Sequence, residues 1–144
     1  MAQRALIAGC GYVGTALGLA LAGQGVEVFG LRRRTSALPP EIRPVSADLS
    51  RPETLRGLPG GIDLLFYTAA AGGGSEEAYR AAYVDGPRHL LRALAARPPR
   101  RVLFTSSTGV YAQGDGEWVD EASPAEPTHF SGRTLLEGER LFSG

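Results

Sequence analysis

The amino-acid sequence predicts an α/β protein, a doubly wound parallel sheet of about five strands in the order 3-2-1-4-5. Along the 144 residues, short apolar runs alternate with longer amphipathic or alanine-rich segments. This alternation is typical of parallel strands joined by right-handed helical crossovers. The apolar runs are nearly continuous, which indicates strands that are covered on both faces. The length suits one ordinary domain, and we expect residues 1–144 to form it.

The first part of the chain contains three predicted strands and one helix. Arg4–Ala8 is an apolar strand that ends at a glycine, and Val26–Leu31 is a second strand. Between them, the alanine- and leucine-rich Tyr12–Ala22 is predicted to be a helix, because glycines follow its end. Arg43–Ala47 is a short third strand, which Pro44 weakens because proline has no N–H to donate to a neighbour.

The second part of the chain adds two strands and three helices. Ser75 is a suitable N-cap for the central helix, since its hydroxyl can accept a hydrogen bond from the first turn. Gly86 and Pro87 should kink or divide that helix, because proline lacks the N–H and its ring crowds the preceding turn. The predicted elements are the helix Arg51–Arg56, the strand Ile62–Tyr67, the helix Ser75–Ala96, the strand Val102–Thr105 and the helix Ser131–Phe142.

Composition and charge exclude several functional classes. Fifteen arginines balance fifteen acidic residues, without the basic excess expected of a nucleic-acid-binding protein. The single cysteine, Cys10, excludes an intrachain disulfide and a cysteine-rich metal site. No apolar run approaches the roughly 20 residues that a membrane-spanning helix needs. We therefore expect a soluble cytoplasmic protein with no metal site, no nucleic-acid partner and no membrane segment.

A glycine-rich turn follows the first predicted strand and opens the first helix. Gly9 is placed to make the tight turn, Gly11 to let a pyrophosphate approach the backbone, and Gly14 to let the helix pack on the strand. Phosphate would then face the unpaired N–H groups at the helix N-terminus. This context favours dinucleotide binding in a Rossmann fold; the alternative is a purely structural turn. The predicted cofactor contacts here are Gly9, Cys10, Gly11, Tyr12, Val13 and Gly14.

The end of the second predicted strand favours NADP over NAD. An NAD site usually places an acidic residue there to bind the ribose 2′-hydroxyl. This chain has Arg32 and Arg33 instead, and guanidinium groups suit a 2′-phosphate. In the alternative, the arginines form a solvated loop and NAD remains possible. Asp48 and Leu49 would flank the adenine, unless Asp48 is a simple turn or cap residue.

Four stretches of the chain together resemble the extended short-chain dehydrogenases, the nucleoside-diphosphate-sugar epimerase/dehydratase family. These stretches are Gly9–Gly14, Ala47–Leu49, Thr68–Ala71 and Phe104–Tyr111, and the last is the most specific. The resemblance implies hydride transfer between a nicotinamide cofactor and a small-molecule carbonyl or alcohol, with a sugar nucleotide as the default substrate. It also implies a homodimer.

The same resemblance implies roles for individual residues. Ala69, Ala70 and Ala71 would line the nicotinamide-ribose side of the cofactor. Ser107 would be the active-site hydroxyl that binds the substrate oxygen, and Ser106 would support the cofactor. The alternative for both serines is that they satisfy backbone groups at the end of a strand. Tyr83 either reaches the site or packs on the sheet, and packing is favoured.

The chain departs from this family at its catalytic pair, Tyr-x-x-x-Lys. Phe130 or Ser131 stands in place of the tyrosine, and Thr134 or Leu135 in place of the lysine. Arg133 could replace the lysine charge, with a surface arginine as the alternative. Relatives also continue into further strands and a substrate domain, which we expect this chain to lack. The alternative function is therefore a non-catalytic NADP(H)-binding sensor or regulatory module.

Overall fold

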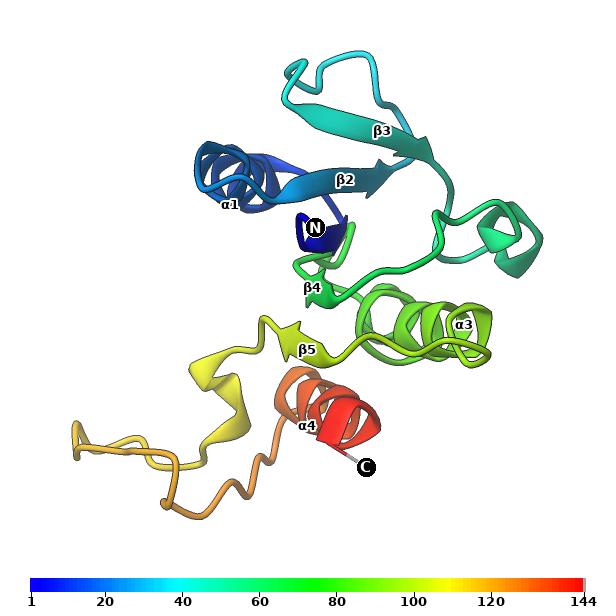
Figure 1. Ribbon diagram of the computed structural model, residues 1–144. Coiled ribbons are helices and arrows are strands. Elements are labelled where there is room, and N and C mark those ends of the chain that lie inside the picture. The colour runs from blue at the N-terminus through cyan, green and yellow to red at the C-terminus, as the bar shows by residue number, and fades with distance from the viewer. Residues whose placement is uncertain (144) are drawn as a thin grey trace.

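Residues 1–143, which the computed structural model describes, form a five-stranded parallel sheet with helices on both faces (Figure 1). The strand order β3-β2-β1-β4-β5 confirms the predicted topology. The strands are β1 (Arg4–Ala8), β2 (Glu27–Arg32), β3 (Ile42–Ser46), β4 (Leu64–Tyr67) and β5 (Arg101–Phe104). The helices are α1 (Tyr12–Gly23), α2 (Glu76–Arg80), α3 (Gly86–Ala93) and α4 (Phe130–Ser143), with short 3₁₀ turns η1 (Pro52–Leu55) and η3 (Thr108–Val110) and a π-helical turn η2 (Ala81–Asp85).

Two apolar layers bury the central strands from opposite sides. Ile7 and Val28 pack against α1, whereas Leu6 and Leu65 belong to the larger core that includes residues of α3. Neighbouring residues of β1 therefore enter different layers, since successive side chains of a strand point to opposite faces. The two layers fully cover residues 5–8 of β1, which explains why this stretch is continuously apolar. Pro44 lies in β3 at the edge of the sheet, where a missing N–H is tolerated.

The central helix is divided where the sequence predicts it. Ser75 caps α2 by accepting the Ala78 amide at 3.1 Å, and a π-helical turn then joins α2 to α3. Pro87 supplies no N–H to this turn, and the Tyr67 hydroxyl donates instead to the carbonyl of Ala82. The predicted end at Ala96 is wrong: α3 ends at Ala93, and the next residues form turns. Other element bounds differ from prediction by one or two residues, as is usual at frayed ends.

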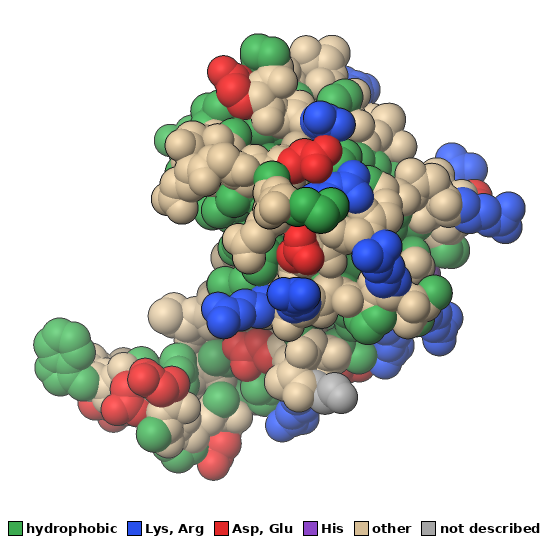
Figure 2. Space-filling model, in the orientation of Figure 1, with side chains coloured by type: hydrophobic (Ala, Val, Ile, Leu, Met, Phe, Trp, Pro, Cys, Tyr) green, Lys and Arg blue, Asp and Glu red, His purple; other side chains and the backbone are tan. Residues whose placement is uncertain are grey.

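A long loop between η3 and α4, residues 111–129, extends away from the sheet (Figure 1). Acidic side chains gather along it, as Figure 2 shows, and Trp118 is 98% exposed. Tyr111 packs within the loop, where its hydroxyl donates to the Asp120 carbonyl at 2.9 Å. Among the described residues, no helix is long and apolar enough to cross a membrane, and no group of three or more His, Cys, Asp or Glu could hold a metal ion.

Candidate functional site: a cleft at the carboxyl ends of the strands

The glycine turn is braced from the strands on both sides of β1. The amides of Gly9 and Cys10 both donate to the Leu31 carbonyl on β2, at 3.0 and 2.9 Å. From the other side, the Thr68 hydroxyl donates to the Gly9 carbonyl at 2.9 Å. The Arg32 guanidinium adds a longer contact of 3.4 Å to the Cys10 carbonyl. The turn is thus fixed before any ligand binds.

The three glycines of the turn meet different surroundings. Gly9 has φ +85°, and a Cβ there would collide with the backbone of Ala69. A Cβ on Gly14 would lie 2.9 Å from the Ile7 side chain, so glycine is required for α1 to approach β1. At Gly11 the nearest atom to such a Cβ is 4.0 Å away, which leaves open space. Gly11 therefore faces a space that a ligand can fill, and Gly9 and Gly14 serve packing.

The open space beside Gly11 belongs to a cleft of about 1060 Å³ at the carboxyl ends of β1, β2 and β4. In parallel α/β sheets, ligands bind at this end of the strands, where the strand order reverses. Ten of the predicted cofactor residues line the cleft: Gly9, Gly11, Tyr12, Val13, Arg32, Arg33, Asp48, Leu49, Ala69 and Ala70. The side chains of Tyr12 and Val13 are 95% and 59% exposed, so apolar surface lies at its mouth.

Four other residues predicted to contact the cofactor, Cys10, Gly14, Ala71 and Ser106, are not part of the cleft lining. The Cys10 thiol is completely buried behind the turn, beside Gly30 and 3.9 Å from the Thr15 hydroxyl. Burial raises the pKa of this thiol, and the hydrogen bond from Thr15 opposes the rise. The Cys10 amide and carbonyl are bonded to Leu31 and Arg32, so Cys10 braces the turn and does not line the cleft.

Arginines form one wall of the cleft at the end of β2. Arg32 is half-buried, while Arg33 and Arg34 are exposed, and all three line the cleft. The Ser46 hydroxyl donates to the Arg33 carbonyl at 3.2 Å and so holds this segment against β3. The cleft thus carries positive charge next to the glycine turn, which favours an anionic ligand.

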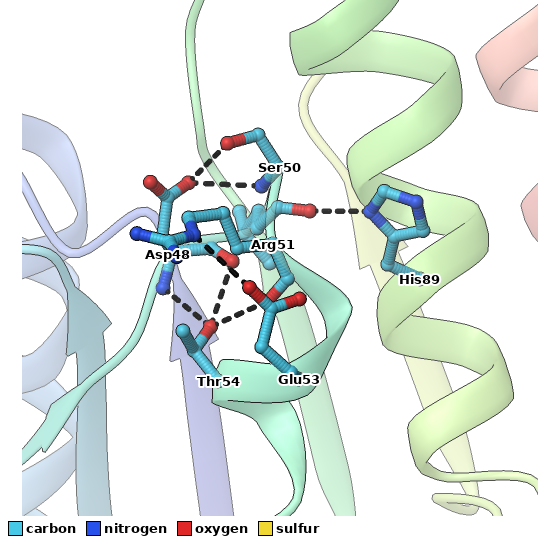
Figure 3. A network of polar contacts seen from close by, with 7 residues as sticks. Asp48, Ser50, Arg51, Glu53, Thr54 and His89 are labelled. Carbon is cyan, nitrogen blue, oxygen red and sulfur yellow. Dashed lines mark hydrogen bonds and ion pairs between the residues drawn. The ribbon is translucent and has the colours of Figure 1, made fainter.

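The loop after β3 lines the cleft beside the arginine segment, and its polar contacts appear in Figure 3. Asp48 Oδ1 accepts both the amide and the hydroxyl of Ser50, at 2.9 and 2.6 Å. These bonds lower the pKa of the Asp48 carboxyl, so it is ionised at neutral pH. The Thr54 hydroxyl accepts the Asp48 amide at 2.9 Å, and the His89 ring contacts the Leu49 carbonyl from α3. Asp48 is therefore a turn-forming residue as well as part of the cleft lining.

The predicted catalytic residues lie near the end of β5 and the start of α4, outside the cleft lining. The Ser107 hydroxyl accepts the Gly109 amide at 3.1 Å and caps η3. The Ser106 hydroxyl donates to Glu139 of α4 at 2.6 Å. The exposed Arg133 donates to the carbonyl of Thr128. The Ser107 contact is of the kind weighed as the alternative, in which the serines satisfy backbone groups, whereas Ser106 is bonded to a side-chain carboxylate.

An aromatic cluster separates the start of α4 from the loop after β4. The Tyr79 ring lies 5.4 Å from Tyr83 and 5.7 Å from Phe130, the first residue of α4. Tyr83 also packs edge-on against Phe104 at 6.3 Å, while its hydroxyl accepts the Ala71 amide at 3.4 Å. Tyr83 thus packs against aromatic rings, as the sequence favoured, and its hydroxyl also reaches the loop next to the cleft. Thr134 is buried, and its hydroxyl donates to the Phe130 carbonyl at 2.7 Å.

Sequence reasoning missed several residues of the site. Thr68 braces the glycine turn and lines the cleft, and Ser50 orders the Asp48 carboxylate. Ala78, Ala81 and Ala82 line the cleft from α2 and η2. Their spacing of three and four residues was the available signal, because it places small side chains on one face of a helix.

Comparison with known proteins shows which family this chain resembles. Residues 5–134 match the model of the NAD dependent epimerase/dehydratase family. A dTDP-6-deoxy-L-talose 4-dehydrogenase (NAD(P)(+)) of Kitasatospora kifunensis is 31% identical over 142 residues, covering 94% of this chain and 45% of the relative.

Solved structures that are similar to this chain come from the same family. A Methylobacillus flagellatus protein described as an NAD-dependent epimerase/dehydratase is 39% identical with a TM-score of 0.85, covering 100% of this chain and 51% of that one. A short-chain dehydrogenase/reductase superfamily protein of Agrobacterium tumefaciens, solved with bound NAD, is 30% identical with a TM-score of 0.83. The match covers 96% of this chain and 44% of that one. This chain thus spans about half the length of these relatives. It belongs to the NAD-dependent epimerase/dehydratase family.

Proposed function

We propose that this chain is the cofactor-binding part of an NAD(P)-dependent oxidoreductase or epimerase, and that it prefers NADP. The observation that carries the proposal is the open position at Gly11, facing a cleft whose wall is formed by Arg32, Arg33 and Arg34. The pyrophosphate would lie over the turn and the α1 N-terminus, whose unpaired N–H groups favour anions. The arginines would donate paired hydrogen bonds to a ribose 2′-phosphate.

The proposed substrate is a carbonyl or alcohol, with a nucleotide sugar as the class that the Kitasatospora relative's name suggests. The nicotinamide would supply hydride acceptor or donor chemistry when the cofactor is bound. Ser107 would orient the substrate oxygen: its Oγ accepts the Gly109 amide, and its own hydrogen has no acceptor within residues 1–143. That hydrogen is available to a substrate, so the hydroxyl can bind backbone and substrate together.

Calorimetric titration of the purified chain with NADPH and NADH tests the cofactor proposal. Arg32→Asp should weaken NADPH binding by about 10- to 100-fold, since it removes charge-assisted hydrogen bonds and adds repulsion. NADH binding should be unchanged or tighter. Arg140→Asp, on the exposed surface of α4, is the matched control for net charge. Equal affinity of the wild-type chain for the two cofactors would contradict the role given to the arginines.

A second candidate function is a non-catalytic NADP(H)-binding module. It is favoured by Phe130 and Thr134 at the start of α4. A phenyl ring has no proton to transfer, and the Thr134 hydroxyl is buried. Oxidation of NADPH with nucleotide-linked keto sugars, followed at the nicotinamide absorbance, separates the two. Turnover supports the enzyme, whereas tight NADPH binding without turnover of any such sugar supports the module.

A further inference from the structure

His89 lies on α3, and its ring contacts the loop after β3 (Figure 3). Its Nδ1 is 2.6 Å from the carbonyl oxygen of Leu49, a residue that lines the cleft. A carbonyl oxygen can only accept, so Nδ1 carries the hydrogen of this bond. His89 itself is absent from the cleft lining, so any effect on a ligand must act through Leu49.

The same helix holds the Leu49 side chain as well as its backbone. A Cβ added to Gly86 would lie 3.4 Å from Leu49 Cβ, so the leucine rests over this glycine. Gly86 and His89 are three residues apart and therefore share one face of α3. Leu49 is thus held at two points by one rigid element, and its side chain packs against the main core.

Between its two ends, the other polar contacts of this loop are local and fix its shape. Asp48 is bound by Ser50 and Thr54, and all three belong to the segment that follows β3. The segment is anchored at its two ends, where the Ala47 amide donates to the Arg32 carbonyl at 3.2 Å and Leu55 is buried in the main core. The bond from His89 comes instead from a helix 40 residues further along the chain. It ties the segment to the side of the sheet where α3 packs.

We propose that His89 is a positioning residue for the adenosine end of the cofactor, acting through the Leu49 carbonyl. This inference rests on the proposed dinucleotide function. Asp48 Oδ1 is occupied by Ser50, and the Asp48 carboxylate can bind an adenine amino group only if the loop stays in place. The hydrogen bond from His89 keeps the loop there before the cofactor arrives, which reduces the ordering cost of binding.

The test compares His89→Met with His89→Gln. The two side chains have similar length and helix propensity, but only glutamine keeps a donor for the Leu49 carbonyl. Calorimetry should show NADPH and 2′,5′-ADP both binding about three- to tenfold more weakly to His89→Met, the factor expected for one lost hydrogen bond. His89→Gln should stay within about twofold of wild type. Arg92→Leu, an exposed change on the same helix, should bind both ligands normally.

Three outcomes would overturn the inference: unchanged binding in His89→Met, equal losses in the two His89 variants, or a loss for NADPH without one for 2′,5′-ADP. Failure of the wild-type chain to bind either ligand would instead refute the proposed function. Hydrogen exchange of the ligand-free chain then still tests the contact. The amides of Ser50 and Arg51, both bonded to Asp48 at 2.9 Å, should exchange faster in His89→Met while β1 stays unchanged. Unchanged exchange there would also overturn the inference.

Discussion

Gly11→Val should abolish dinucleotide binding without destabilising the fold. The nearest atom to a Cβ at this position is the Gly9 carbonyl oxygen at 4.0 Å, so the fold can hold a larger side chain. We expect the free energy of unfolding to change by no more than about 0.5 kcal/mol. The valine methyl groups would occupy the space proposed for the pyrophosphate. Losing two charge-assisted hydrogen bonds to the turn costs about 3–6 kcal/mol, which weakens binding by at least about 100-fold.

Gly14→Ala is the matched control in the same turn, because it should lower the stability of the fold without filling the space proposed for the pyrophosphate. Its Cβ would lie 2.9 Å from Ile7 Cγ2 and 3.0 Å from the Thr68 hydroxyl. Overpacking of this kind costs about 1–3 kcal/mol, which lowers Tm by roughly 3–12 °C for a domain of this size. Thermal melts and NADPH titrations of both variants are the assay. Normal NADPH affinity in a folded Gly11→Val chain would refute the pyrophosphate placement.

Two further predictions concern the helices that pack beside the cleft. Tyr67→Phe should destabilise the chain by about 1–3 kcal/mol in urea unfolding, because the Ala82 carbonyl loses the buried hydroxyl that donates to it; an unchanged midpoint would show that this bond contributes nothing. Glu137→Gln should reduce stability near pH 7 by less than about 1 kcal/mol, since the pair with Arg80 is partly exposed. That hydrogen bond lowers the pKa of the Glu137 carboxyl below 4.5, so its contribution is present above about pH 4.5 and disappears as the pH falls. Wild type and variant should therefore converge in stability toward pH 3, and a constant difference would contradict the ion pair.

The parts of the fold that local chemistry decides could be predicted from the sequence. The glycine turn is one, because each glycine of Gly9–Gly14 meets a constraint that the strand–turn–helix context already implies. The division at Pro87 is another, since a missing N–H acts on the adjacent turn. The strand order followed from the Rossmann-type glycine turn together with the alternation of strands and helices, since crossover rules alone also allow the order 2-1-3-4-5.

Contacts between distant segments could not be predicted in this way. The Ser106 hydroxyl faces Glu139, 33 residues away, and no local pattern indicates that partner. His89 and Leu49 are 40 residues apart and meet only because α3 packs beside the loop after β3. Side-chain direction at the end of β5 depends on how α4 docks, so the predicted cofactor role of Ser106 remains a prediction.

The docking of α4 bears directly on how any chemistry could proceed. Cβ atoms at Gly132 and Gly138 would collide with the carbonyl groups of Gly109 and Tyr83, so α4 lies close against η3 and η2. Thr134, between the two glycines, is only 4% exposed. A lysine at this position would have to bury its charge or push the helix away, and both are costly. The absence of lysine here therefore fits the tight helix packing. Any proton transfer would need another group, such as the hydroxyl of Ser107 or Tyr83, or that of Ser131, which lies 2.7 Å from His129 Nδ1.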